Sequence, residues 1–146
     1  LGTHCAELIA DIRDYIVNIH PRASVQFNVD PTSGALRIAA DLSLRHAVIN
    51  LIENAIKHGL EPKTGGGRIW INARRDLDAD SITVTVADDG IGFGGDTAGT
   101  GIGLKNIRER LQLAYGNAAR FSIIANFPQG VAASISVPLA GSQARV

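Results

Sequence analysis

The 146-residue chain has a single cysteine, no methionine and no excess of charge of either sign. One cysteine, Cys5, cannot form an internal disulfide, which favours a reducing, cytoplasmic compartment. Lys and Arg together number 14, as do Asp and Glu, so no net charge attracts nucleic acid or an anionic membrane. Apolar runs are also short: none reaches the roughly 18 residues needed to span a bilayer, and no signal-peptide pattern is present.

The apolar content is nevertheless sufficient for a core. At 45% hydrophobic residues, the chain predicts one globular domain, and it contains no internal repeats. The chain begins at Leu1 and lacks methionine throughout, which predicts that it is a piece of a longer protein.

Residues 4–19 carry apolar side chains at the helical spacing i, i+3, i+4 and i+7. This stripe predicts an amphipathic helix that ends before Pro21. Two interpretations stay open: the stripe covers this domain's own core, or it is the end of a longer helix that pairs with another chain. The members of the stripe are Cys5, Leu8, Ile9, Ile12, Tyr15, Ile16 and Ile19.

Extended segments are predicted where apolar and polar residues alternate between turn signals. One of them alternates Ile82, Val84 and Val86 with threonines and ends at Asp88. Strands with one apolar face, combined with amphipathic helices, predict a two-layer α/β sandwich. The predicted segments are 25–29, 36–39, 69–73, 82–88, 121–126 and 131–137.

A second helix is predicted over residues 42–59, after Asp41 as its N-cap, and it carries two stripes. Asparagine is unfavourable inside helices, so two asparagines in register on one face hint at a site, although a solvated face explains them equally simply. The apolar stripe is Leu44, Ala47, Val48, Leu51, Ile52, Ala55 and Ile56, and the polar stripe is Asn50, Glu53, Asn54 and Lys57, with His46 one turn upstream.

Residues 88–108 hold seven of the chain's 16 glycines. The glycine-rich part leads into a third predicted helix, 103–115, which stops at Gly116-Asn117. A glycine loop before a helix directs free N–H groups and the positive end of the helix dipole at an anion, typically a phosphate. By itself, such a loop is also compatible with a flexible surface segment.

Three segments in this order resemble the N, G1 and G2 boxes of the GHKL ATPase superfamily, which includes gyrase, Hsp90, histidine kinases and MutL. The chain looks most like the catalytic ATP-binding domain of a sensor histidine kinase. The run from Gly103 to Leu111, followed by Tyr115-Gly116, is similar to the LytS-type branch. The resemblance implies the Bergerat fold: a mixed, mostly antiparallel sheet with helices on one face. The three segments are 50–59, 88–92 and 99–104.

The G1 resemblance implies that Asp88 accepts a hydrogen bond from the exocyclic amine of adenine, a donor that guanine lacks there. The alternative is that Asp88 only forms a turn before Gly90. The glycines Gly90 and Gly92 would let the backbone pass beside the purine. Asp89, where the family often has Asn, is expected to have only a turn or supporting role.

The N-box resemblance implies that Asn54 offers its amide oxygen to Mg²⁺, which prefers oxygen ligands and shares substrate phosphates. Lys57 would offset phosphate charge, and Asn50 would contact phosphate or a metal-bound water. Glu53 would orient a water or the incoming histidine, or simply lie at the surface. The hydrolysing relatives have a glutamate where this chain has Asn50, which favours transfer to an acceptor over hydrolysis.

The G2 resemblance implies that backbone N–H groups bind the β- and γ-phosphates of ATP. Two departures from the family pattern also matter. The ATP lid, Phe93–Ala98, is short. Gly130 is followed by Val131 and Ala132 rather than by threonine, which predicts modest adenine affinity. The expected phosphate-binding residues are Gly99, Thr100, Gly101, Gly103 and Leu104, with Lys105 as a helper.

None of the four histidines, His4, His20, His46 and His58, lies in a motif for phosphorylation. We therefore expect the acceptor histidine upstream, with residues 1–20 as the end of a connector and 21–146 as the catalytic domain.

The expected partners are a histidine-bearing dimerisation domain and a response regulator, in a homodimeric parent protein, with no nucleic acid and no membrane contact by this piece. The alternatives are a serine kinase of the anti-sigma-factor type, which shares the motif Glu53-Asn54-Ala55-Ile56, and a non-catalytic nucleotide-sensing module.

Overall fold

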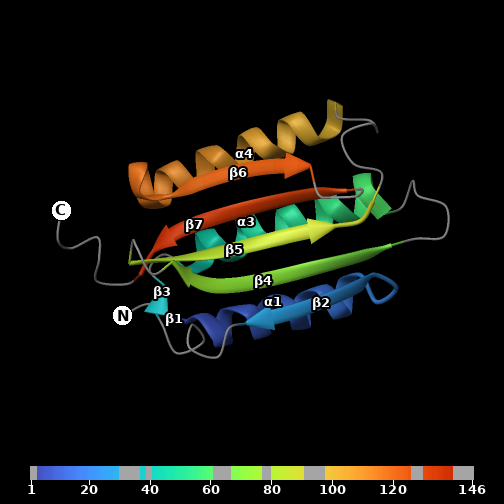
Figure 1. The fold of residues 1–146 in the computed structure, drawn as a ribbon, viewed down its shortest axis with the longest axis horizontal. Helices are drawn as coiled ribbons and strands as arrows, with labels where there is room; N and C mark the ends of the chain where they lie inside the picture. Colours follow the sequence, from blue (N-terminus) through green and yellow to red (C-terminus); the bar gives the residue numbers. More distant parts are fainter. Residues whose placement is uncertain are drawn as a thin grey trace.

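The computed structural model describes residues 3–29, 37–38, 41–60, 67–76, 80–90, 98–125 and 130–139 (Figure 1). Helices and strands alternate irregularly along the chain. In order they are β1 (Thr3–His4), α1 (Cys5–Ile19), β2 (Ser24–Val29), β3 (Arg37–Ile38), α3 (Asp41–Asn54), the π-helical turn η1 (Ala55–Leu60), β4 (Arg68–Asp76), β5 (Ser81–Asp88), α4 (Ala98–Tyr115), the 3₁₀ turn η3 (Gly116–Ala118), β6 (Arg120–Ala125) and β7 (Val131–Pro138).

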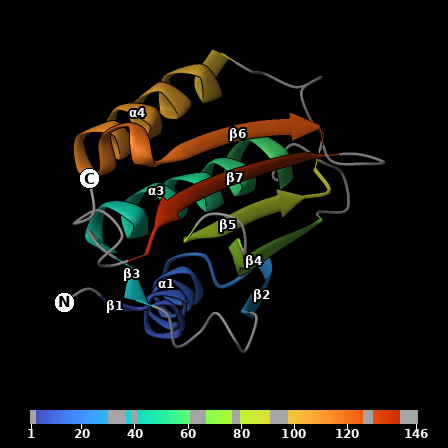
Figure 2. The same cartoon turned by 60° about the vertical axis from the view of Figure 1, so that its left-hand side comes forward.

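The main sheet has five strands in the order β2-β4-β5-β7-β6. Only the β2–β4 pair is parallel, and the other three pairs are antiparallel. All three α-helices cover one face of this sheet (Figures 1 and 2). The predicted two-layer sandwich with a mixed, mostly antiparallel sheet is therefore confirmed.

The core lies between the helices and the inner face of the sheet. Along β5, Ile82 and Val84 are fully buried and Val86 nearly so, whereas the intervening threonines face the open side. There Thr83 and Thr85 each form a hydrogen bond with a serine of β7, at 2.6 and 3.0 Å between the hydroxyl oxygens. This alternation fixes the register of β5, because a shift by one residue would expose the apolar set.

Helix α1 packs on this domain's own core, so the first of the two interpretations of its stripe is the one that the structure shows. Ile19 was expected in the stripe but is 54% exposed, since it lies in the last turn, past the packed segment. The helix begins at Cys5, because His4 has an extended backbone and pairs with β3 in a small second sheet that the sequence did not predict. The connection of residues 1–20 to an upstream domain stays a prediction.

The second and third helices differ from their predicted bounds. Helix α3 ends at Asn54 and continues as the π-helical turn η1, rather than as an α-helix to residue 59. Ala55 and Ile56, the last members of the predicted apolar stripe, are buried in this π turn. Helix α4 begins at Ala98, five residues before the predicted start, so helical geometry extends through the glycines despite their low propensity.

The predicted stop of α4 is confirmed, because the helix ends at Tyr115 and Gly116 follows with φ +59°. Within the described residues, no helix is both long and apolar enough to cross a membrane.

Candidate functional site

The carboxylate of Asp88 lies at the end of the central strand β5 and is 4% exposed. It is the only charged side chain in the described part of the chain that is buried. Its Oδ1 atom accepts a hydrogen bond from the N–H of Gly90 at 2.8 Å, so the predicted turn role is present. A carboxylate can accept several hydrogen bonds, and burying one is costly unless partners use that capacity. Asp88 therefore has the position expected of a buried acceptor for a ligand.

The neighbouring Asp89 ties the end of β5 to the start of β4. Its Oδ1 atom accepts from the backbone N–H of Arg68 at 2.6 Å, and its own N–H donates to the Arg68 carbonyl at 3.2 Å. The supporting role predicted for Asp89 is thus the one observed. These two bonds fix the strand end from which Asp88 projects.

Gly130 packs directly against the backbone of this strand end. It is buried, has φ +112°, and a Cβ atom added to it would lie 1.9 Å from the carbonyl oxygen of Asp88. Any residue other than glycine would therefore clash with backbone and strain its own φ angle. This contact was not predicted from the sequence. Its one local signal is the turn Pro128-Gln129-Gly130.

Asn54, at the end of α3, carries an unsatisfied polar atom. Its side-chain Nδ2 atom is buried and has no hydrogen-bond partner in the described part of the chain. A buried polar group without a hydrogen-bond partner costs about 1–3 kcal/mol. Such groups are uncommon in folded proteins unless a ligand supplies the missing partner. Asn50, one turn earlier, is also partly buried, whereas Lys57 in η1 is exposed.

Two members of the polar face predicted on α3, His46 and Glu53, contact different neighbouring helices. His46 faces α4, where its Nδ1 atom lies 3.2 Å from Nη1 of Arg110. Glu53 faces α1, where its Oε2 atom lies 2.9 Å from Nε2 of His20. His46 thus contacts α4, and the carboxylate of Glu53 is engaged with His20 at the end of α1. His20 was not among the predicted site residues.

The predicted phosphate-binding segment 99–104 lies in the first turns of α4. The first four N–H groups of a helix have no partner within it, so those of residues 98–101 belong to the free, positive end of the dipole. Gly103 and Leu104 lie beyond that turn, where a helical N–H bonds to the carbonyl four residues earlier. Their role as phosphate donors stays a prediction. Gly92 and residues 93–97 of the predicted lid lie outside the described residues, whereas its last residue, Ala98, begins α4.

Magnesium would find a limited donor set here. No group of three or more His, Cys, Asp or Glu side chains in the described ranges could hold a metal ion. Mg²⁺ typically takes one or two protein oxygens and the rest from phosphates and water. The unsatisfied atom of Asn54 is its Nδ2 donor, which calls for an acceptor such as a phosphate oxygen, whereas Mg²⁺ would take the amide oxygen. Because one amide side chain carries both groups, the chemistry of Asn54 fits such a minimal site.

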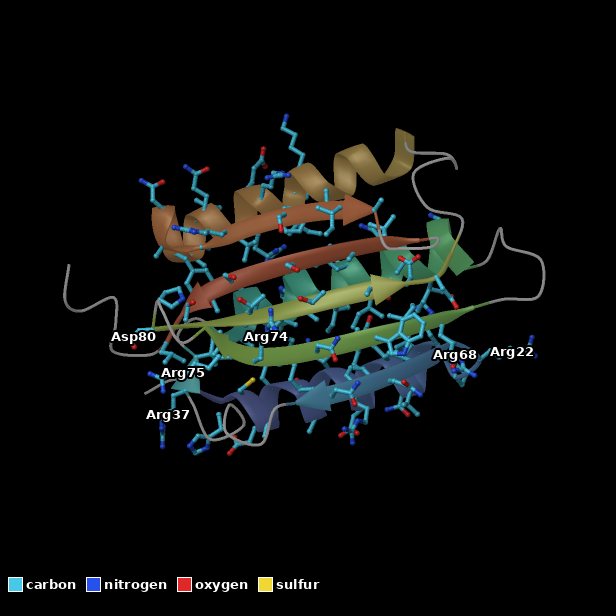
Figure 3. The ribbon with its side chains drawn as sticks, in the orientation of Figure 1. Arg22, Arg37, Arg68, Arg74, Arg75 and Asp80 are labelled. Atoms are coloured by element: carbon cyan, nitrogen blue, oxygen red, sulfur yellow. The ribbon has the colours of Figure 1, made fainter. Side chains whose placement is uncertain are left out.

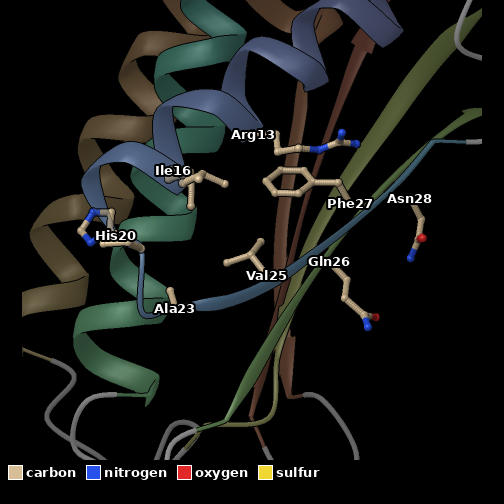
Figure 4. A pocket seen from close by; sticks show the side chains of 10 residues that line it. Arg13, Ile16, His20, Ala23, Val25, Gln26, Phe27 and Asn28 are labelled. Carbon is tan, nitrogen blue, oxygen red and sulfur yellow. The ribbon is translucent and has the colours of Figure 1, made fainter.

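A separate cavity of about 500 Å³ opens between α1 and β2 (Figure 4). Neither Asp88 nor Asn54 lines it. The Arg13 guanidinium lies over the Phe27 ring at 5.6 Å from its centroid, and His20 lies at the end of α1. The other lining residues are Ile16, Val17, Pro21, Ala23, Val25, Gln26 and Asn28.

Residues 39–141 match the family described as "Histidine kinase-, DNA gyrase B-, and HSP90-like ATPase". The sensor histidine kinase YesM of Bacillus subtilis (strain 168) is 38% identical over 92 residues, which is 60% of this chain. The match covers only 16% of the length of that relative.

Several solved histidine kinase structures share the fold. The catalytic domain of ThkA superposes with a TM-score of 0.73 at 20% identity, covering 93% of this chain and 94% of that one. The blue-light-activated histidine kinase of Erythrobacter litoralis EL346 gives a TM-score of 0.73 at 20% identity, over 97% of this chain and 43% of that one. Full-length ShkA in complex with AMPPNP gives 0.73 at 21% identity, over 96% of this chain and 31% of that one. The chain belongs to the ATPase family named above, as an ATP-binding domain with the fold of histidine kinase catalytic domains.

Proposed function

We propose that this domain binds Mg·ATP and donates the γ-phosphoryl group to a histidine in a dimerisation domain outside this chain. In this reaction the bond from the γ-phosphorus to the β–γ bridging oxygen breaks, a bond to a histidine nitrogen forms, and ADP leaves. The observation that carries the proposal is the buried carboxylate of Asp88 at the end of β5. The complex of ShkA with AMPPNP supports the nucleotide assignment by analogy.

Adenine selection would rest on Asp88. One of its oxygens already accepts from Gly90, and the carboxylate has further acceptor capacity for the exocyclic amine of adenine. A guanine carbonyl in that position would face a buried carboxylate without a proton between them, which is strongly unfavourable. Gly90 and Gly92 would leave room beside the ring, while Val131 and Ala132 offer no side-chain hydroxyl to assist.

The phosphates would lie between α3 and the start of α4. Asn54 would hold Mg²⁺ through its amide oxygen, and the ion would supply charge neutralisation on the phosphates. Asn50 would contact phosphate or a metal-bound water, and the exposed Lys57 would add positive charge. The backbone N–H groups of Gly99, Thr100 and Gly101, at the free end of α4, would donate to the phosphates, with Lys105 as a helper. Gly103 and Leu104 follow one turn further into the helix.

The wider assignment concerns the parent protein. We propose a cytoplasmic catalytic domain of a homodimeric kinase of the LytS-type branch, supported by the run from Gly103 to Leu111 and by Tyr115-Gly116. The acceptor histidine would come from a dimerisation domain preceding residues 1–20, and a response regulator would receive the phosphoryl group.

The proposal is tested by substituting Asn54 in a kinase that carries this domain together with its dimerisation domain. Asn54→Ala should lower Mg²⁺-dependent phosphorylation of the partner histidine by about 100-fold, because positioning and charge neutralisation dominate phosphoryl transfer. The acid lability of the product distinguishes phosphohistidine from phosphoserine.

The matched control is Asn72→Ala. Asn72 is exposed on β4 and only contacts Asn28, at 3.3 Å between the side chains, so its loss should leave transfer unchanged. Normal phosphorylation by the Asn54 variant would contradict the metal role. Absence of ATP binding by the unmodified chain at millimolar nucleotide would reject the assignment as an enzyme.

A further inference from the structure

The side chains of His20 and Glu53 form a hydrogen bond between α1 and the nucleotide-site helix α3. His20 Nε2 and Glu53 Oε2 are 2.9 Å apart, and the two side chains are only 27% and 35% exposed. An ionised carboxylate can only accept hydrogen bonds, so His20 must carry a proton on Nε2 and donate it. Thirty-three residues separate the pair in sequence, and the bond therefore joins two elements rather than stabilising one.

His20 is itself held by its backbone. Its N–H donates to the carbonyl of Ile16 at 2.8 Å, which closes the last turn of α1, and its carbonyl accepts from the N–H of Ala23 at 3.1 Å. Helix α1 is in turn packed into the core, where Ile12 and Ile16 are fully or almost fully buried. His20 is consequently a fixed point against which another side chain can be aligned.

Glu53 occupies the place in α3 where such alignment matters. It directly precedes Asn54, the last residue in α-helical geometry, after which the chain enters the π turn η1. A π turn interrupts the regular ladder of hydrogen bonds, so the helix backbone alone constrains this point less than it would a helix interior. The buried Nδ2 atom of Asn54 makes no hydrogen bond to the described residues, so no bond of that nitrogen to them helps to orient the side chain.

We propose that His20 is a positioning residue for phosphoryl transfer, which holds Glu53 and thereby fixes the turn of α3 that presents Asn54 to Mg²⁺ and phosphate. The inference rests on the proposed function. It also gives Glu53 a role that its contacts support, because the carboxylate holds the turn of α3 that carries Asn54 against His20 at the end of α1. Outer partners of metal ligands typically change affinity or activity by about 10- to 100-fold when removed.

The chain offers a matched control between the same two helices. Arg45 of α3 forms an ion pair with Asp11 of α1, and its guanidinium also lies over the Tyr15 ring, 5.5 Å from the centroid. Arg45 lies two turns before Glu53 on the same side of α3. Removing this pair loosens α1 against α3 without touching the turn that carries Asn54.

The experiment compares His20→Leu, His20→Gln and Asp11→Ala in a kinase that includes the dimerisation domain. His20→Leu fills similar space but cannot donate, and it should lower the transfer rate at saturating ATP by about 10-fold or more. It should also raise the Mg²⁺ concentration for half-maximal transfer, with ATP affinity measured without Mg²⁺ unchanged. His20→Gln keeps an N–H donor and should restore most of the rate, whereas Asp11→Ala should transfer normally.

Three results would overturn the inference: a normal rate and Mg²⁺ dependence in His20→Leu, an equal loss in His20→Leu and Asp11→Ala, or no recovery in His20→Gln. If His20→Leu does not fold, His20→Asn takes its place, because its amide is too short to reach Glu53. Failure of the unmodified kinase to bind ATP or phosphorylate histidine would reject the proposed function itself. Normal transfer in every variant would reject only the role of His20.

Discussion

The two ends of strand β5 are built in different ways (Figure 3). At the Ser81 end, an exposed ion pair joins Arg75 and Asp80 at 3.3 Å, and the backbone N–H of Leu139 donates to the Asp80 carbonyl. The small β1–β3 sheet joins this end through the pairing of Ile38 with Leu139. At the Asp88 end, by contrast, the structure buries a carboxylate and presses a left-handed glycine against its backbone.

We infer from this difference that the Asp88 end is the one that serves a ligand. Exposed ion pairs and backbone bonds close the end of a sheet at little cost. Burying the Asp88 carboxylate costs free energy that exposed groups do not incur, and the Nδ2 atom of Asn54 is buried without a hydrogen-bond partner in the described part of the chain. Such features accumulate where a protein is arranged around something that it binds. The following predictions test this contrast, from the largest expected effect on stability to the smallest.

Among the described residues, Gly116 and Gly130 have positive φ angles, and their surroundings differ. Gly130→Ala should lower the free energy of unfolding by about 2–4 kcal/mol and weaken ATP binding, because its Cβ would overlap the Asp88 carbonyl. Gly116→Ala should cost only about 1 kcal/mol and leave ATP binding unchanged, since nothing lies within 4 Å of its added Cβ. Chemical denaturation and calorimetry measure both effects. Equal losses of binding in the two variants would show that the contact with Asp88 is irrelevant.

Cys5, away from the proposed site, should make the free energy of unfolding depend on pH. Burial raises the pKa of this thiol from 9.0 to about 11. Between these two pH values the thiol of Cys5 keeps its proton in the folded state and loses it in the unfolded state. The stabilisation that this thiol gives to the folded state is therefore complete below pH 9 and is lost as the pH rises through 11. The loss should reach about 2–3 kcal/mol of unfolding free energy.

The test of the Cys5 prediction is the difference between the unmodified chain and Cys5→Ala. Both contain the same other titrating groups, so only the difference in slope between pH 9 and 11 reports the thiol. Identical slopes would contradict the assignment. ATP binding at neutral pH should be the same in both proteins.

The smallest effect is expected from the exposed pair Arg75 and Asp80. Asp80→Asn should change the free energy of unfolding by less than about 1 kcal/mol, because exposed ion pairs contribute little. It should leave ATP affinity unchanged, as measured by calorimetry. A clear loss of affinity would mean that the two ends of β5 are coupled and would weaken the contrast drawn above.

Much of the fold followed from local patterns. The alternation along β5 predicted both its buried face and the delivery of Asp88 at its end, and the stripe on residues 4–19 predicted α1. The family resemblance, carried by three short segments in order, predicted the mixed sheet. The strand and the helix could be predicted because the spacing of apolar residues along a short segment reveals its periodicity.

Other features depend on contacts between distant segments, which no local pattern contains. The bond between His20 and Glu53 and the packing of Gly130 against Asp88 appear only after α1, α3 and β7 are assembled. The π turn after Asn54 and the start of α4 at Ala98, within a glycine-rich segment of low helix propensity, were likewise not predicted. The predicted roles of Asn50, Lys57 and the glycines of 99–104 await experiment.

The most direct test of the nucleotide assignment is calorimetric titration of ATP into the unmodified chain, Asp88→Asn and Asp89→Asn. Asn at position 88 keeps an oxygen for the Gly90 N–H but replaces the other acceptor with a donor, and should weaken ATP binding by about 30- to 100-fold. Asp89→Asn keeps its bond from the Arg68 N–H and should bind ATP like the unmodified chain. Equal ATP affinity in all three, with folding intact by circular dichroism, would contradict the role of Asp88 in reading adenine.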